Sequence, residues 1–138
     1  MAMDRLHDVA RLLISSLALA SGENRQIPTS HGILDRAIRD AYAQFPGWAQ
    51  DEIHIADSRV GWQCVELPAI LGWAQAAELT SAPNPYYRRT ELQVSPRVAR
   101  VLLKRLGVPE EDAKRLGDAV MASIQSHQNE PNEVAIAD

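Results

Sequence analysis

The sequence predicts a single, mainly α-helical domain of about five helices with one small β-hairpin. Three observations predict this fold class. The chain has 138 residues, which is enough for one well-packed domain and too few for two. Apolar residues recur at helical spacing in five separate segments. Two prolines near the middle of residues 77–94 are followed by residues that favour strands, so we place the hairpin there. We assign residues 1–126 to the domain and residues 127–138 to a polar C-terminal tail.

The first predicted helix, residues 6–20, carries two adjacent apolar stripes. A helix with so wide an apolar surface has to be covered, either by the core of its own chain or by a second copy. Both alternatives are open at the level of the sequence, and the second predicts a homodimer. The residues assigned to that subunit interface are Leu6, Val9, Leu12, Leu13 and Leu17.

The same segment does not fit a secretory signal or a membrane span. Asp4 and Asp8 cancel the charges of Arg5 and Arg11, whereas a secretory signal begins with net positive charge. The apolar run over residues 9–20 is also well short of the about 20 residues that cross a bilayer. We therefore expect no membrane association.

The second helix is predicted over residues 33–45. Thr29 or Ser30 is suited to cap its N-terminus, and Pro46 and Gly47 end it.

The middle of the chain is harder to assign. Apolar residues over 48–67 alternate as in short strands, but the alternation is interrupted, so this segment is a short strand or irregular coil. Pro68 then suits the first turn of a helix that runs to about Leu79.

The last two helices have clear start and stop signals. Ser95 is a good N-cap, and Pro96 suits the first position of the helix that follows. Gly107 ends this helix. Pro109 and the three acidic residues after it begin a last helix that runs to Ser126, because acidic side chains favour the positive end of the helix dipole.

Composition excludes several classes of protein. The net charge of -4 excludes a polycation that coats nucleic acid along its whole surface. Cys64 is the only cysteine, which excludes an internal disulfide and a cysteine-rich zinc site, and which favours the reducing cytoplasm. The four histidines lack a second ligand at metal-binding spacing, and no glycine-rich phosphate loop occurs. We therefore expect no cofactor and no metal.

A catalytic site is not expected either. His54 and Asp57 are close enough in sequence to pair a base with a carboxylate, but Ser58 lacks the glycine frame of an activated nucleophile. Cys64 lies among apolar residues, where a buried thiol is more common than a reactive thiolate. We predict that the chain is not an enzyme.

Charge is unevenly distributed along the chain. Residues 86–105 hold six basic residues and one acidic residue, a net charge of +5. The remaining residues hold 8 basic and 17 acidic side chains, a net charge of -9. Basic charge is therefore concentrated on the predicted hairpin and the helix after it, which favours a local anion-binding surface. The acidic residues after 106 offer an alternative, because they could neutralise this surface within the chain.

The segment from Leu79 to Ser95, LTSAPNPYYRRTELQVS, resembles the wing of winged helix-turn-helix regulators of the MarR type. The resemblance covers about residues 68–106, under a third of the chain. It implies a winged-helix-like fold with a recognition helix over 68–79, a wing over 83–89, and dimerising helices at the two ends. The residues that we assign to nucleic-acid binding are Gln75, Tyr86, Tyr87, Arg88, Arg89, Arg97, Arg100 and Lys104.

Two functions remain. The first is a small DNA-binding or regulatory protein that holds duplex DNA mainly by phosphate contacts, because the outer side of the 68–79 helix offers few side chains suited to base edges. The second is a non-catalytic interaction or adaptor module whose basic segment docks an acidic protein partner.

Overall fold

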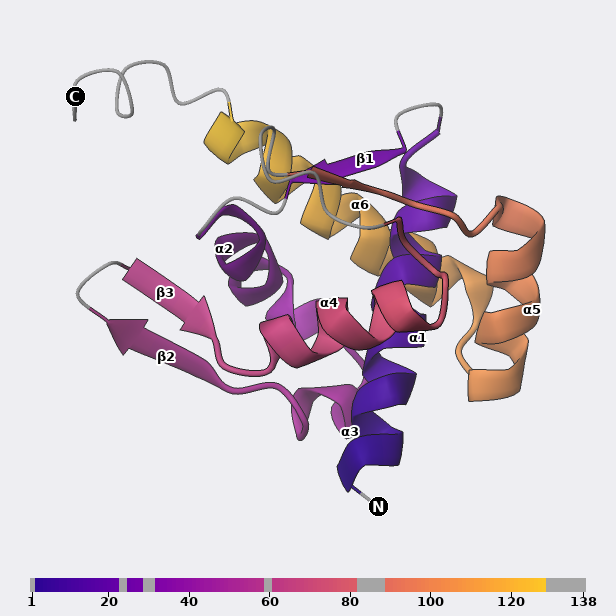
Figure 1. The fold of residues 1–138 in the computed structure, drawn as a ribbon, viewed down its shortest axis with the longest axis horizontal. Helices are drawn as coiled ribbons and strands as arrows, with labels where there is room; N and C mark the ends of the chain where they lie inside the picture. The colour runs from indigo at the N-terminus through magenta and orange to yellow at the C-terminus, as the bar shows by residue number, and fades with distance from the viewer. Residues whose placement is uncertain (1, 23–24, 29–31, 59–60, 82–88, 129–138) are drawn as a thin grey trace.

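The computed structural model describes residues 2–22, 25–28, 32–58, 61–81 and 89–128, and it is mainly helical (Figure 1). This confirms the predicted fold class. The described elements are α1 (Ala2–Ala20), β1 (Gln26–Pro28), α2 (Ile33–Asp40), the 3-10 turn η1 (Tyr42–Gln44), α3 (Gly47–Gln50), β2 (Ile55–Ser58), β3 (Gly61–Cys64), α4 (Leu67–Ala76), β4 (Arg89–Glu91), α5 (Pro96–Leu106) and α6 (Glu110–Gln128).

Helix α1 is the centre of the fold. It packs against α4, α5 and α6, so both of its apolar stripes are covered by the same chain. Every residue from Leu12 to Ala18 is buried. Four of the five predicted interface residues expose at most 1% of their surface; they are Val9, Leu12, Leu13 and Leu17. The fifth, Leu6, is partly buried and packs against the same core. The core of the chain covers these side chains, so they are not available to a second copy, and homodimerisation itself stays a prediction.

The two long helices, α1 and α6, cross in very close contact. Gly117 of α6 lies against the backbone of α1, and a Cβ atom built on it would be 2.1 Å from the carbonyl oxygen of Ser16. Only a residue without a side chain allows this approach. The core then continues along α6 through apolar side chains at helical spacing, which are Ala113, Leu116, Val120 and Ile124.

The helix predicted over residues 33–45 is divided in two. Helix α2 ends at Asp40 and is followed by η1 and by the single turn of α3. The sequence analysis placed the stop at Pro46, and Phe45 does take the extended conformation that a following proline favours. The helix nevertheless ends one turn earlier. Described residues thus contain six α-helices where five were predicted, and the sixth is the single turn of α3.

The strands form two small antiparallel sheets. β2 pairs with β3 as a hairpin within the segment that was ambiguous between strand and coil. β4 pairs with β1, in a segment where no strand was predicted. The predicted hairpin near residues 77–94 is present as a return of the chain, because Thr80 bridges Leu92 and the Gln93 N–H donates to the Leu79 carbonyl over 2.8 Å. Residues 82–88, between these two sides, lie outside the described part of the chain.

The start signals of α4 and α5 and the stop signal of α5 act as predicted. Pro68 lies in the first turn of α4, although that helix ends at Ala76 and not at Leu79. The Ser95 hydroxyl accepts a hydrogen bond of 3.2 Å from the Val98 N–H, and Gly107 ends α5 in the left-handed conformation. Helix α6 runs two residues beyond the predicted end, to Gln128. The rest of the predicted tail is outside the described residues.

Candidate functional site

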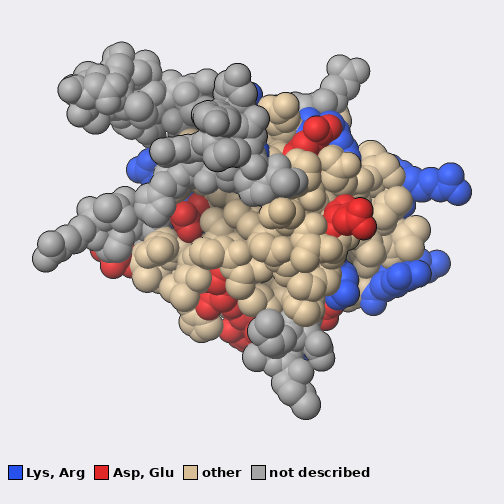
Figure 2. Space-filling view, in the orientation of Figure 1, with Lys and Arg blue, Asp and Glu red and all other residues tan. Residues whose placement is uncertain are grey.

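The outer face of α5 carries the basic charge that the sequence analysis predicted for this region. Its four basic residues are exposed, and the helix contains no acidic residue; they are Arg97, Arg100, Lys104 and Arg105. The first three lie on one stripe because their spacings of three and four residues match the helical repeat. Figure 2 shows blue side chains projecting from the edge of the molecule where Figure 1 places α5. The structure therefore brings these cations together on one exposed surface, which we call the α5 face.

Internal neutralisation of the α5 face is small. Arg100 forms one exposed ion pair with Glu110, at 3.2 Å. Two other carboxylates of α6 pair along their own helix instead, Asp112 with Arg115 and Asp118 with Lys114. The remaining cations of the α5 face form no ion pair with a described residue. The predicted alternative, that acidic residues after 106 cancel the basic segment, thus applies to Arg100 alone within the described residues.

The α5 face also has an apolar component. Val98 and Val101 each expose 47% of their surface, although they lie on a helix whose opposite side is buried in the core. Together with the flanking cations they form a surface that is both basic and apolar. Such a combination suits contact with another macromolecule better than contact with water.

The other predicted nucleic-acid-binding residues are divided. Arg89 lies exposed on β4, where its guanidinium donates to the Gln26 Oε1 over 3.2 Å. Gln75 lies exposed on α4, and no cluster of basic residues is near it in the sequence. The predicted residues Tyr86, Tyr87 and Arg88 lie outside the described part of the chain.

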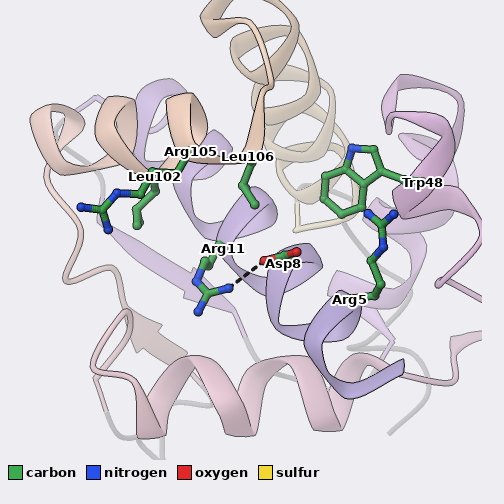
Figure 3. Close-up of a pocket in the computed structure, with 7 residues that line it drawn as sticks. All are labelled: Arg5, Asp8, Arg11, Trp48, Leu102, Arg105 and Leu106. Atoms are coloured by element: carbon green, nitrogen blue, oxygen red, sulfur yellow. Dashed lines mark hydrogen bonds and ion pairs between the residues drawn. The ribbon is translucent and has the colours of Figure 1, made fainter. Parts of the chain in front are cut away.

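A cleft of about 410 Å³ opens beside the α5 face, between α1, α3 and α5 (Figure 3). Three arginines line it, Arg5 and Arg11 from α1 and Arg105 from the last turn of α5. One carboxylate, from Asp8, lies among them. The apolar part of the lining consists of Leu102, Leu106 and the indole of Trp48. The lining therefore holds two more positive charges than negative ones.

Two tryptophans hold the arginines of α1 in place. The Arg5 guanidinium lies 5.5 Å from the centre of the Trp48 ring, which it underlies in Figure 3. Arg11 lies 4.8 Å from the centre of the Trp73 ring and donates to Asp8 Oδ1 over 2.7 Å. Both are cation–π contacts, in which the positive guanidinium is attracted to the face of the aromatic ring. Arg105 has no such partner among the described residues.

Two of the side chains that were considered for catalysis, His54 and Cys64, are respectively in contact with a carboxylate and buried in the core. His54 is exposed, and its Nδ1 lies 2.6 Å from Glu66 Oε2, so its carboxylate partner is Glu66 and not Asp57. Burial, followed in size by the charge of the nearby Glu66 carboxylate, raises the pKa of the Cys64 thiol from 9.0 to about 12. A thiol in this state is protonated at neutral pH and is a poor nucleophile.

The described residues contain neither a metal-binding cluster nor a membrane-spanning helix. No group of three or more histidine, cysteine or acidic side chains is placed to hold a metal ion there. None of the described helices is both long and apolar enough to cross a membrane. No protein-family model, curated protein or solved structure matches the chain.

Sequence reasoning missed the cleft. Its lining residues come from three helices that are far apart along the chain, and the charges of Arg5 and Arg11 were interpreted only as cancelled by neighbouring aspartates. The position of Trp48 beside an arginine has no signal in the local sequence.

Proposed function

We propose that this chain is a small DNA-binding or regulatory protein that holds duplex DNA through phosphate contacts from the α5 face. The observation that carries the proposal is the charge arrangement of α5. Four exposed cations follow one helix without an acidic neighbour on it, and three of them form no ion pair with a described residue. Arginine and lysine on such a surface neutralise phosphates of the duplex and release bound counterions.

The return of the chain between α4 and α5 supports the winged-helix interpretation of this proposal. Thr80 and Leu92 form an antiparallel bridge, and β4 is paired on its other side with β1. Residues 80 and 92, which lie on either side of the predicted wing (residues 83–89), are therefore held next to each other by backbone hydrogen bonds. A protruding loop that contacts DNA needs such a base.

The surface of α4 supports binding that tolerates many sequences. Among the exposed residues of α4, only Gln75 has a side chain that can form hydrogen bonds with a base edge. The other exposed residues are apolar or lack a side chain; they are Pro68, Ala69, Gly72 and Ala76. Phosphate contacts therefore supply most of the affinity, and base contacts supply little.

A salt titration of duplex DNA binding tests the proposal. Contacts from four cations predict a slope of log affinity against log salt of about -3 to -4, because each phosphate contributes about -0.9. The double substitution Arg97→Gln with Lys104→Gln should reduce the steepness of the slope by about 2 and should leave the preference among sequences unchanged.

The matched control is Lys114→Gln with Arg115→Gln. This variant removes the same charge, but both residues lie on α6 and are paired with aspartates there. Its slope should differ from that of the wild type by less than about 0.5. Absence of binding at low salt, or equal slopes for the two double variants, would contradict the proposal.

The second candidate function is an adaptor that docks an acidic protein partner, and the exposure of Val98 and Val101 favours it. Duplex DNA gains little from apolar contacts on a phosphate-binding surface, whereas protein interfaces have apolar centres. Replacing both valines by serine should change DNA affinity by less than about twofold if DNA is the partner. A folded wild type that binds no DNA at low salt would favour the adaptor.

A further inference from the structure

We propose that the cleft between α1, α3 and α5 binds a small organic anion that carries one carboxylate or phosphate group on an apolar body. The cleft shares Arg105 with the α5 face, and its other lining residues have no part in the DNA-binding proposal. Its volume of about 410 Å³ lies within the range of about 300 to 1,000 Å³ that is typical of small-ligand sites.

The charge of the lining selects an anion. Three arginines and one carboxylate line the cleft, and the Asp8 carboxylate is already engaged by Arg11. Arg5 contacts the ring of Trp48 and forms no ion pair with a described residue, and neither does Arg105. Two guanidinium groups thus retain the planar set of donors that matches the oxygens of a carboxylate or a phosphate.

The apolar part of the lining selects a ligand with a carbon body. Leu102 and Leu106 project from α5, and Figure 3 shows Leu106 between the Trp48 side of the cleft and the side that holds Arg11 and Arg105. An inorganic ion would leave these surfaces in contact with water. An aromatic or branched aliphatic body would cover them and so add to the affinity of the anionic group.

The arginines are held before any ligand arrives. The cation–π contacts of Arg5 with Trp48 and of Arg11 with Trp73 restrict both arginine side chains. The Trp73 ring is itself stacked on the ring of His7, with the two ring centroids 4.4 Å apart. A restricted arginine loses less conformational entropy when it binds an anion, which favours binding.

The test is an NMR titration of the Trp48 indole N–H with benzoate, phenyl phosphate and benzamide. The resonance is assigned by its loss in Trp48→Phe. Benzoate or phenyl phosphate should shift it with a Kd on the order of 1 mM or lower. Benzamide has the shape of benzoate without its charge and should bind at least about tenfold more weakly. The stronger of the two anions identifies which acid group the cleft prefers, and either one supports the proposal.

Charge variants of the cleft sharpen the test. Arg105→Gln and Arg5→Gln should each weaken the binding of benzoate about fivefold, because each removes a charged donor. Asp8→Asn should strengthen it about threefold, because it removes a repelling charge beside Arg11. Arg97→Gln makes the same charge change as Arg105→Gln about 12 Å earlier on the same helix, and it should alter the Kd less than twofold.

Several results would overturn the proposal. Equal shifts by benzamide and benzoate would show that the cleft binds apolar molecules without regard to charge. The absence of binding by both anions at about 20 mM would show that it binds neither. An unchanged Kd in both arginine variants, or a loss of binding in Asp8→Asn, would place the anion elsewhere. These outcomes are separate from the DNA titration, since Arg97→Gln should change the DNA slope and not the benzoate Kd.

Discussion

The crossing of α1 with α6 and the outer face of α5 differ in the substitutions that they tolerate. At the crossing, the backbone of one helix touches the other where Gly117 meets Ser16, and almost no surface is exposed. On the α5 face, four cations and two valines reach into solvent with a single ion pair to another element among the described residues. Folding therefore depends on close atomic contact at the crossing, whereas the proposed DNA binding depends on charge at the α5 face. Substitutions in the two regions should therefore have separable effects.

Gly117→Ala is expected to give the largest effect. Its added Cβ would lie 2.1 Å from the Ser16 carbonyl oxygen, so α1 and α6 would have to move apart along their whole contact. Overpacking of this severity should lower the free energy of unfolding by about 3 kcal/mol or more. Urea denaturation measures it.

The matched control for this substitution is Gly72→Ala. Gly72 lies in α4, and a Cβ there meets no atom within 4 Å, so alanine should raise the free energy of unfolding by about 0.5 to 1 kcal/mol. Equal effects of the two substitutions would show that helix propensity, and not the close crossing, decides the result.

Asp35→Ala tests a buried polar contact between α2 and β3. The Asp35 carboxylate accepts a hydrogen bond of 2.7 Å from the Cys64 N–H, and the residue exposes only 8% of its surface. Alanine leaves that N–H without a partner, which should lower the free energy of unfolding by about 2 kcal/mol. Asp57→Ala, at an exposed position on β2, should change it by less than about 0.5 kcal/mol in the same measurement.

Cys64 predicts a dependence of stability on alkaline pH. Its thiol has a pKa of about 12 when folded against a reference value of 9.0, so both states keep the proton below pH 9. Between pH 9 and pH 12 the unfolded chain loses its proton first, and stability falls by about 1 kcal/mol for each pH unit. The free-energy difference between wild type and Cys64→Ala should therefore shrink between about pH 8 and about pH 10. A constant difference across this interval would contradict it.

The smallest effects on stability are expected on the α5 face. Arg97→Gln and Lys104→Gln should each change the free energy of unfolding by less than about 0.5 kcal/mol, because neither side chain has an ion-pair partner among the described residues. Thermal unfolding of the same preparations used for DNA titration measures this. A large destabilisation would mean that these cations serve the fold, and the separation between the two regions would fail.

What the sequence predicted well was local. Ser95, Pro96 and Gly107 fix the ends of α5 through interactions within one turn, so their positions alone predict the helix. The pairing of β1 with β4 could not be predicted in this way. It joins positions such as Ile27 and Thr90, which are 63 residues apart, through strands of three residues with no alternating apolar pattern in the sequence.

The candidate sites divide along the same line. The α5 face was predictable because its cations repeat along one helix, and the periodicity places them on one side. The burial of α1 in the core of its own chain could not be predicted for a global reason, since nothing in residues 6–20 shows that α4, α5 and α6 converge on them. The cleft depends on the same convergence and so has no local signature.

The contact between Gly117 and Ser16 also bears on the order in which the chain is made. A ribosome adds Gly117 about a hundred residues after Ser16, and at about 5 to 20 residues per second this takes about 5 to 20 seconds. During that interval the nascent chain has an apolar α1 without the helix with which it makes its most extensive contact. Vectorial synthesis therefore leaves this segment exposed to chaperones and to other nascent chains until α6 leaves the exit tunnel.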